Sequence, residues 1–175
     1  VILVTTFTLT LIFPSKIFNM PTILDVEGKS PRIPNSCFIA PNATILGDVS
    51  FGENCSVWFS TVVGADVCTI EIADNVNIQD GVVLHGTYQK HDLYIGDNVS
   101  IGHNALVHGC RIENNVLIGM GATVMDNCHV KSNSIIAAGA VLLENTVVES
   151  GFADRTLIVK GHLTQHAQAI DIRVQ

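Results

Sequence analysis

The chain has few charges, few aromatic side chains and no cluster of basic residues. Charged residues occupy 14% of the 175 positions and aromatic residues 6%, against 47% for hydrophobic residues. This composition is too apolar for a disordered chain, and the shortage of rings predicts a core of small aliphatic side chains. The formal net charge is −7, and Lys and Arg form no run. We therefore expect neither nucleic acid nor an anionic membrane as a partner.

The five cysteines form no CxxC pair, and their number is odd. A disulfide scaffold or a cysteine zinc site is therefore not expected. We interpret these residues as reduced, buried thiols of a cytoplasmic protein.

The N-terminal segment is apolar but short. Residues 1–13 are too few to span a bilayer, and they lack the basic start of an export signal. We interpret residues 1–25 as an N-terminal extension of uncertain role. The alternative is that residues 1–19 belong to an export signal whose beginning is missing.

An aliphatic residue recurs every sixth position along most of the chain. From residue 112 onward the series is Ile112, Ile118, Val124, Val130, Ile136, Leu142 and Val148. The same step occurs at 33–63, 72–84 and 95–107. Four residues after each aliphatic there is usually a small or β-branched residue, and three of the cysteines occupy this position. Six residues match neither the period of a helix nor that of an isolated alternating strand.

A six-residue period fits a short strand followed by a corner. Three such units make one triangular coil, and stacked coils bury a continuous column of side chains. The series predicts an all-β parallel β-helix of about six coils over residues 26–150. Residues 151–175 are expected to form a short C-terminal tail or helix. The period alone does not fix the hand of the coil.

The six-residue step is interrupted three times. Val63 and Ile72 are nine residues apart, Leu84 and Ile95 eleven, and Val107 and Ile112 five. Interruptions in a solenoid are loops or bulges, often on the binding face. The longest interruption starts at a histidine.

Three histidines lie in the repeat around these interruptions. His85 follows Leu84 and His108 follows Val107, so both should lie on one face, one coil apart. Coils rise by about 4.8 Å, a separation that suits two imidazoles on one metal ion. His103 belongs to the preceding face and would reach that ion only from a neighbouring subunit. The spacing therefore predicts a homotrimer with three interfacial metal sites. The alternative is a passive scaffold with surface histidines.

The segment NIQD precedes His85 by one repeat. Asn77 and Gln79 should point outward and are suited to holding water and a polar substrate near a metal. Asp80 is suited to orienting an imidazole. A simple turn at Asp80-Gly81 explains the aspartate equally well.

Four segments together are similar to the γ-class carbonic anhydrases: SVWFSTVVGADV, NIQDGVVLH, IGHNALVHGC and IGMGATV. The resemblance covers residues 26–148. It implies a left-handed β-helix and a homotrimer. It also implies that His85 and His108 of one subunit bind Zn²⁺ (or Fe²⁺ or Co²⁺) with His103 of the next. In this reading, Asn77, Gln79, Asp80 and Asp66 serve the reversible hydration of CO2 to bicarbonate.

The chain departs from that family at one informative position. The family has Arg-Gly-Asp where this chain has Gly64-Ala65-Asp66, and the resemblance implies that this Arg pairs with the Asp across the subunit boundary. Its replacement favours one alternative, a metal-binding trimer without hydratase activity. A second alternative is a hexapeptide acyltransferase or a thioesterase that acts on an acyl-CoA.

Overall fold

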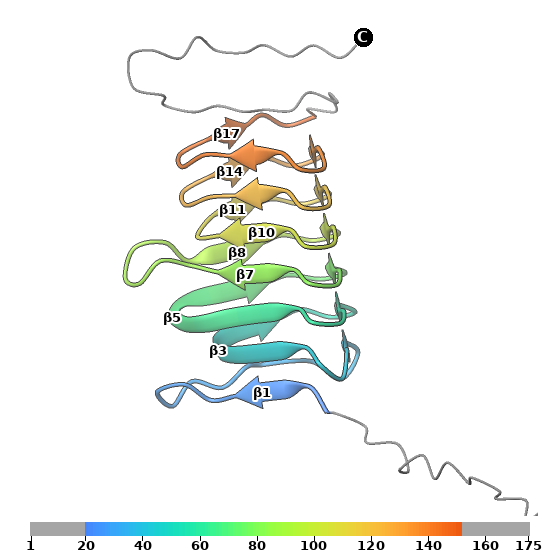
Figure 1. The fold of residues 1–175 in the computed structure, drawn as a ribbon, viewed down its shortest axis with the longest axis vertical. Helices are drawn as coiled ribbons and strands as arrows, with labels where there is room; N and C mark the ends of the chain where they lie inside the picture. The colour runs from blue at the N-terminus through green and yellow to red at the C-terminus, as the bar shows by residue number, and fades with distance from the viewer. Residues whose placement is uncertain (1–19, 152–175) are drawn as a thin grey trace, which may run out of the picture.

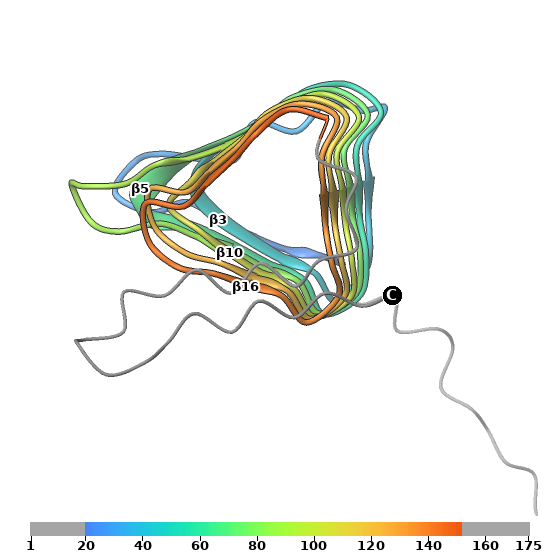
Figure 2. The same cartoon turned by 90° about the horizontal axis from the view of Figure 1, so that it is seen from above.

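Residues 20–151, the part of the chain that the computed structural model describes, form a parallel β-helix of triangular cross-section (Figures 1 and 2). In Figure 1 the chain climbs from bottom to top while the front strands run from right to left, so the coil is left-handed. The predicted fold class is confirmed. The expected C-terminal tail after residue 151, and residues 1–19 of the expected extension, lie outside the described residues.

Each side of the triangle is a ladder of short parallel strands, and we number the sides in chain order. The first face begins with β1 (Thr22–Leu24) and the N-terminal parts of β3 (Thr44–Phe51) and β5 (Val62–Ile72). It continues through β7 (Val83–His85), β10 (Leu106–His108), β13 (Thr123–Val124) and β16 (Val141–Leu142).

The second face begins with the C-terminal parts of β3 and β5. Because these two strands bend around the corner from the first face, the first and second faces form one 11-stranded sheet. Its other strands are β8 (Leu93–Ile95), β11 (Arg111–Ile112), β14 (His129–Val130) and β17 (Val147–Val148). The third face is a separate 6-stranded sheet of β2 (Phe38–Ile39), β4 (Ser56–Val57), β6 (Asn77–Ile78), β9 (Ser100–Ile101), β12 (Leu117–Ile118) and β15 (Ile135–Ile136).

The coils begin before the predicted domain boundary at residue 26. Strand β1 pairs in parallel with β3, with Thr22 opposite Thr44. A three-residue strand is enough to continue the ladder because its backbone groups bond to the coil above. Between residues 20 and 151, no helix is long and apolar enough to cross a membrane.

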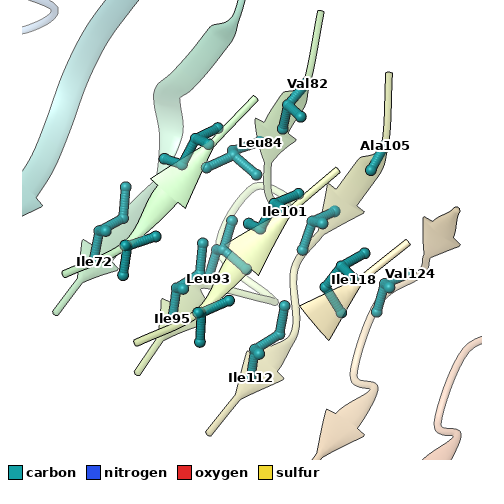
Figure 3. Packing of buried hydrophobic residues seen from close by; sticks show 14 of the residues in the cluster. Ile72, Val82, Leu84, Leu93, Ile95, Ile101, Ala105, Ile112, Ile118 and Val124 are labelled. Carbon is teal, nitrogen blue, oxygen red and sulfur yellow. The ribbon is translucent and has the colours of Figure 1, made fainter. Parts of the chain in front are cut away.

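The residues of the six-residue series fill the interior. Ile78, Ile101 and Ile118 stack directly above one another on the third face and are fully buried. The pairing register stacks Leu84, Val107 and Val124 in the same way on the first face. Figure 3 shows the corresponding stack of Ile72, Ile95 and Ile112 on the second face. The small residues of the second series, such as Ala105 and Ala122, are also buried. Both predicted inward positions are confirmed.

The corners depend on a third periodic position, which the sequence reading overlooked. The residue three places after the inward aliphatic has a positive φ at nearly every regular corner. Asparagine, which tolerates this left-handed conformation better than other non-glycine residues, occupies most of these positions: Asn54, Asn75, Asn98, Asn104, Asn115, Asn127, Asn133 and Asn145. Several of these amides also hydrogen-bond to the asparagine one coil above, for example Asn115 Nδ2 to Asn133 Oδ1 at 3.2 Å.

The five cysteines are free, and three of them are buried. Burial raises the pKa of Cys55 to about 11, so its thiol stays protonated at neutral pH. Packing therefore accounts for the three buried cysteines, as the sequence predicted, whereas Cys37 and Cys68 are only partly buried.

All three interruptions of the repeat stack at one corner, the one between the first and second faces. We call it the irregular corner. There β5 bulges at residues 66–69, and the loop of residues 86–92 projects outward. In the next coil the chain turns tightly at Gly109, which has a φ of 45°, so the step from Val107 to Ile112 is one residue shorter than usual. The projecting loop is the green excursion at the left of Figures 1 and 2. One edge of an otherwise regular prism is thus reshaped.

Neighbouring valines of β17 on the second face provide a matched test of the inward assignment. Val148 is 2% exposed, whereas Val147 is 47% exposed. We expect Val148→Ala to lower the free energy of unfolding by about 2 kcal/mol, since it leaves a cavity in the column. Val147→Ala should lower it by less than about 1 kcal/mol. Urea denaturation of both variants measures the difference, and equal losses would contradict the assignment.

Candidate metal centre

The irregular corner brings His85 and His108 together. The two residues are direct partners in the parallel pairing of β7 with β10. Their ring centroids are 5.3 Å apart, and His85 Nδ1 lies 3.2 Å from His108 Nε2. Two imidazole nitrogens that each bind one tetrahedral ion at about 2.05 Å would lie about 3.3 Å apart. The predicted convergence of these two rings is therefore observed within one chain.

The second nitrogen of each ring faces a carboxylate. His85 Nε2 lies 3.0 Å from Asp66 Oδ1, and His108 Nδ1 lies 2.6 Å from Asp126 Oδ1. Because a carboxylate only accepts hydrogen bonds, the ring protons belong on these two nitrogens. The facing nitrogens then both present lone pairs, which repel unless a cation or a shared proton lies between them. This donor set fits a metal ion such as Zn²⁺.

Asp126 is the member of this group that the sequence reading missed. It is only 14% exposed, and it also accepts a 2.6 Å hydrogen bond from Thr87. Burial raises the pKa of this carboxyl, but the hydrogen bonds from Thr87 and His108 outweigh it, and the net pKa is lowered. The sequence did contain a signal, because the shortened coil has 17 residues, as the pairing of Val107 with Val124 shows, and counting 17 from Gly109, the neighbour of His108, leads to Asp126.

Gly64 lies directly under the His85 ring. A Cβ added there would be 3.0 Å from His85 Cδ2 and 3.6 Å from Asp66 Oδ1. The missing side chain therefore leaves room for His85 to contact Asp66. The resemblance suggested that Asp66 loses its partner when Gly64 replaces an arginine, but the structure supplies one within the same chain.

The corner between the third and first faces holds a second group, which we call the His103 corner. There His103 Nδ1 lies 3.0 Å from Asp80 Oδ2, and the His103 side chain is 46% exposed. Its Nε2 makes no hydrogen bond to any residue of the described range. The backbone N–H of His103 donates to Gln79 Oε1 at 3.2 Å, which leaves the Gln79 amide hydrogens free to donate. Gln79 and Asp80 thus lie beside His103, at a different corner from His85.

Asn77 lies on the third face, where its side chain is already engaged. Its Oδ1 accepts hydrogen bonds from Ser56 Oγ at 2.8 Å and Trp58 Nε1 at 2.9 Å, and its Nδ2 donates to Ser100 Oγ at 3.3 Å. These bonds tie three coils together. Asn77 therefore has a structural role within the chain.

A single chain holds two of the three predicted ligands at one corner and the third at another. Across residues 20–151, no three side chains of His, Cys, Asp or Glu gather in a way that would hold a metal ion. A complete three-histidine site therefore requires His103 to come from elsewhere.

The chain is similar to several known proteins. The family model for the bacterial transferase hexapeptide (six repeats) matches residues 109–144. Gamma carbonic anhydrase 1, mitochondrial, of Arabidopsis thaliana is 38% identical over 110 residues, which cover 60% of this chain and 40% of that protein. A carbonic anhydrase of Geobacillus kaustophilus is 40% identical over 104 residues, which cover 59% of this chain and 57% of that protein. The chain thus spans about half the length of these relatives.

A solved structure matches more fully. The crystal structure of a hexapeptide transferase family protein from Anaplasma phagocytophilum aligns with a TM-score of 0.71 and 41% identity, and the alignment covers 74% of this chain and 76% of that one. This match shows that the chain belongs to the hexapeptide transferase family, and the chain is similar to proteins named gamma carbonic anhydrase and carbonic anhydrase.

Proposed function

We propose that the protein hydrates CO2 reversibly to bicarbonate at a metal site shared between subunits of a homotrimer. The observation that carries this proposal is the 3.2 Å approach of His85 Nδ1 to His108 Nε2, with a carboxylate on the far nitrogen of each ring. Similarity to proteins named as carbonic anhydrases supports the choice of reaction.

His85 and His108 of one subunit and His103 of its neighbour would hold the ion. Three neutral imidazoles suit Zn²⁺, and Fe²⁺ or Co²⁺ accept the same ligands. When bound, such an ion acts as a Lewis acid that lowers the pKa of a water molecule to about 7. The carboxylates of Asp66, Asp80 and Asp126 keep the three rings oriented.

The distribution of charge over the three faces supports a trimer. On the first and third faces, the outward residue that directly precedes each inward aliphatic is uncharged in every coil. On the second face, this position includes the charged residues Glu71 and Arg111. On the first face Val62, Val83 and Leu106 form an apolar column beside the histidine pair, each 37% exposed. Three prisms that bury their first and third faces against one another would leave the charged face in water.

In this arrangement the neighbour contributes its whole His103 corner. The free amide hydrogens of Gln79 would then donate to an oxygen of the reacting water or of bicarbonate. A cleft of about 420 Å³, lined by Asp66, Tyr88 and Lys90 among others, opens from the irregular corner to solvent. This cleft offers a route by which the proton released in hydration reaches bulk water.

Stopped-flow CO2 hydration on zinc- and iron-loaded protein tests the reaction. We expect a rate above the buffer background for the wild type, and a fall of about 100-fold or more in His108→Ala because the ion loses a ligand. His129→Ala is the matched control, since its ring pairs with Glu113 on the second face. A fully metal-loaded trimer that hydrates no CO2 would instead favour a catalytically silent metal-binding protein.

Mixing two inactive variants tests whether the site is shared. His103→Ala and His108→Ala each lack one ligand at every interface. Unfolding and refolding an equal mixture should restore metal and activity at about one quarter of the interfaces, since random assortment recreates that share of complete sites. Separately refolded variants should stay inactive. An equal mixture with no recovered metal would contradict a site shared between subunits.

A further inference from the structure

The loop of residues 86–92 is tied to His108 by a single carboxylate. Asp126 Oδ1 accepts from His108 Nδ1 at 2.6 Å, and Asp126 Oδ2 accepts from Thr87 Oγ1 at 2.6 Å. Thr87 lies near the start of the loop and pairs with His91 near its end: Thr87 N donates to His91 O at 3.0 Å, and His91 N donates to Thr87 O at 3.1 Å. The two oxygens of one side chain thus join the projecting loop to a ring of the candidate metal centre.

Gly109 makes this close approach sterically feasible. A Cβ at Gly109 would lie 2.3 Å from Asp126 Oδ1 and 2.7 Å from His91 Cβ, so any side chain there would displace both. Its φ of 45° further disfavours other residues. The carboxylate, the loop and His108 therefore pack as one unit around a position without a side chain.

We propose that Asp126 is a positioning residue that holds His108 with Nε2 toward the metal and makes this orientation depend on the loop through Thr87. The inference rests on the proposed function, because it assumes that His108 binds a metal. A charged acceptor on the far nitrogen fixes the ring tautomer and increases the basicity of the nitrogen that faces the ion. Since Thr87 holds the second oxygen of the Asp126 carboxylate, a change in the conformation of the loop would alter metal affinity without any substitution of a metal ligand.

Metal affinity provides the test. We expect Asp126→Asn to weaken Zn²⁺ binding about 10–100-fold, the usual effect of losing such a partner, as measured by competition with a chromophoric chelator. Thr87→Val should weaken binding less, by several-fold, and Thr87→Ser should restore it because the hydroxyl returns. The visible spectrum of the Co²⁺ form should change in Asp126→Asn and stay native in Thr87→Ser.

Glu113→Gln is the matched control. Glu113 lies 2.7 Å from His129 on the second face, an equivalent carboxylate–imidazole pair that holds no proposed ligand. This variant should bind Zn²⁺ as the wild type does. Thermal melting and gel filtration establish that each variant keeps the wild-type fold and assembly, and Thr87→Val carries the test if Asp126→Asn does not fold.

The outcomes separate this inference from the proposed function. A wild type that binds no metal would overturn the proposed function itself. A wild type that binds one Zn²⁺ per interface, together with Asp126→Asn of equal affinity and an unchanged Co²⁺ spectrum, would overturn only the role of Asp126. Equal affinity of Thr87→Val and the wild type would remove the dependence on the loop.

Discussion

The parallel stacking of coils is the constraint on which the rest of the structure depends. Backbone N–H groups of each coil donate to carbonyl groups of the coils above and below, so residues of equal register lie directly above one another at about 4.8 Å. This spacing packs Ile78, Ile101 and Ile118 into a dry column, and it also sets His85 beside His108. The backbone pairing that stabilises the fold therefore also brings the two proposed metal ligands together.

The same regularity explains why the site lies where the repeat fails. A perfect prism presents equivalent corners, and none of them has room for a loop or an unusual side-chain contact. At the irregular corner the bulge of β5, the loop of residues 86–92 and the left-handed Gly109 bring Asp66, Thr87 and Asp126 around the two rings. The rigid coils above and below hold these departures in place. Side chains at this corner can therefore be positioned accurately, although some of them, such as Thr87 and Asp126, belong to no strand.

Much of the fold could be predicted from the sequence because its period is simple. The six-residue series specified the inward residues, and its three breaks located the irregular corner. The hand of the coil could not be obtained from the period. The turn positions of the asparagines were overlooked, since their role depends on φ rather than on hydrophobicity. Strand β1 was also missed, because three residues are too few to show a repeat.

The placement of the three histidines could be predicted from the sequence, but the contacts around them could not. Counting along the repeat placed His85 and His108 together and separated His103 from them, as the structure shows. Asp126 was missed because it lies in a later coil, between Val124 and Val130, where the six-residue step is unbroken. The engagement of Asn77 in the third-face ladder, and the pairing of Asp66 with His85, depend on side-chain rotamers that no spacing rule supplies.

Anomalous diffraction from crystals of the zinc-loaded protein, recorded on both sides of the zinc absorption edge, would test the central claim most directly. The account predicts one strong peak per subunit interface, between Nδ1 of His85, Nε2 of His108 and the His103 ring of the neighbouring subunit. A peak elsewhere, or no peak at this corner in crystals of a metal-loaded trimer, would contradict it.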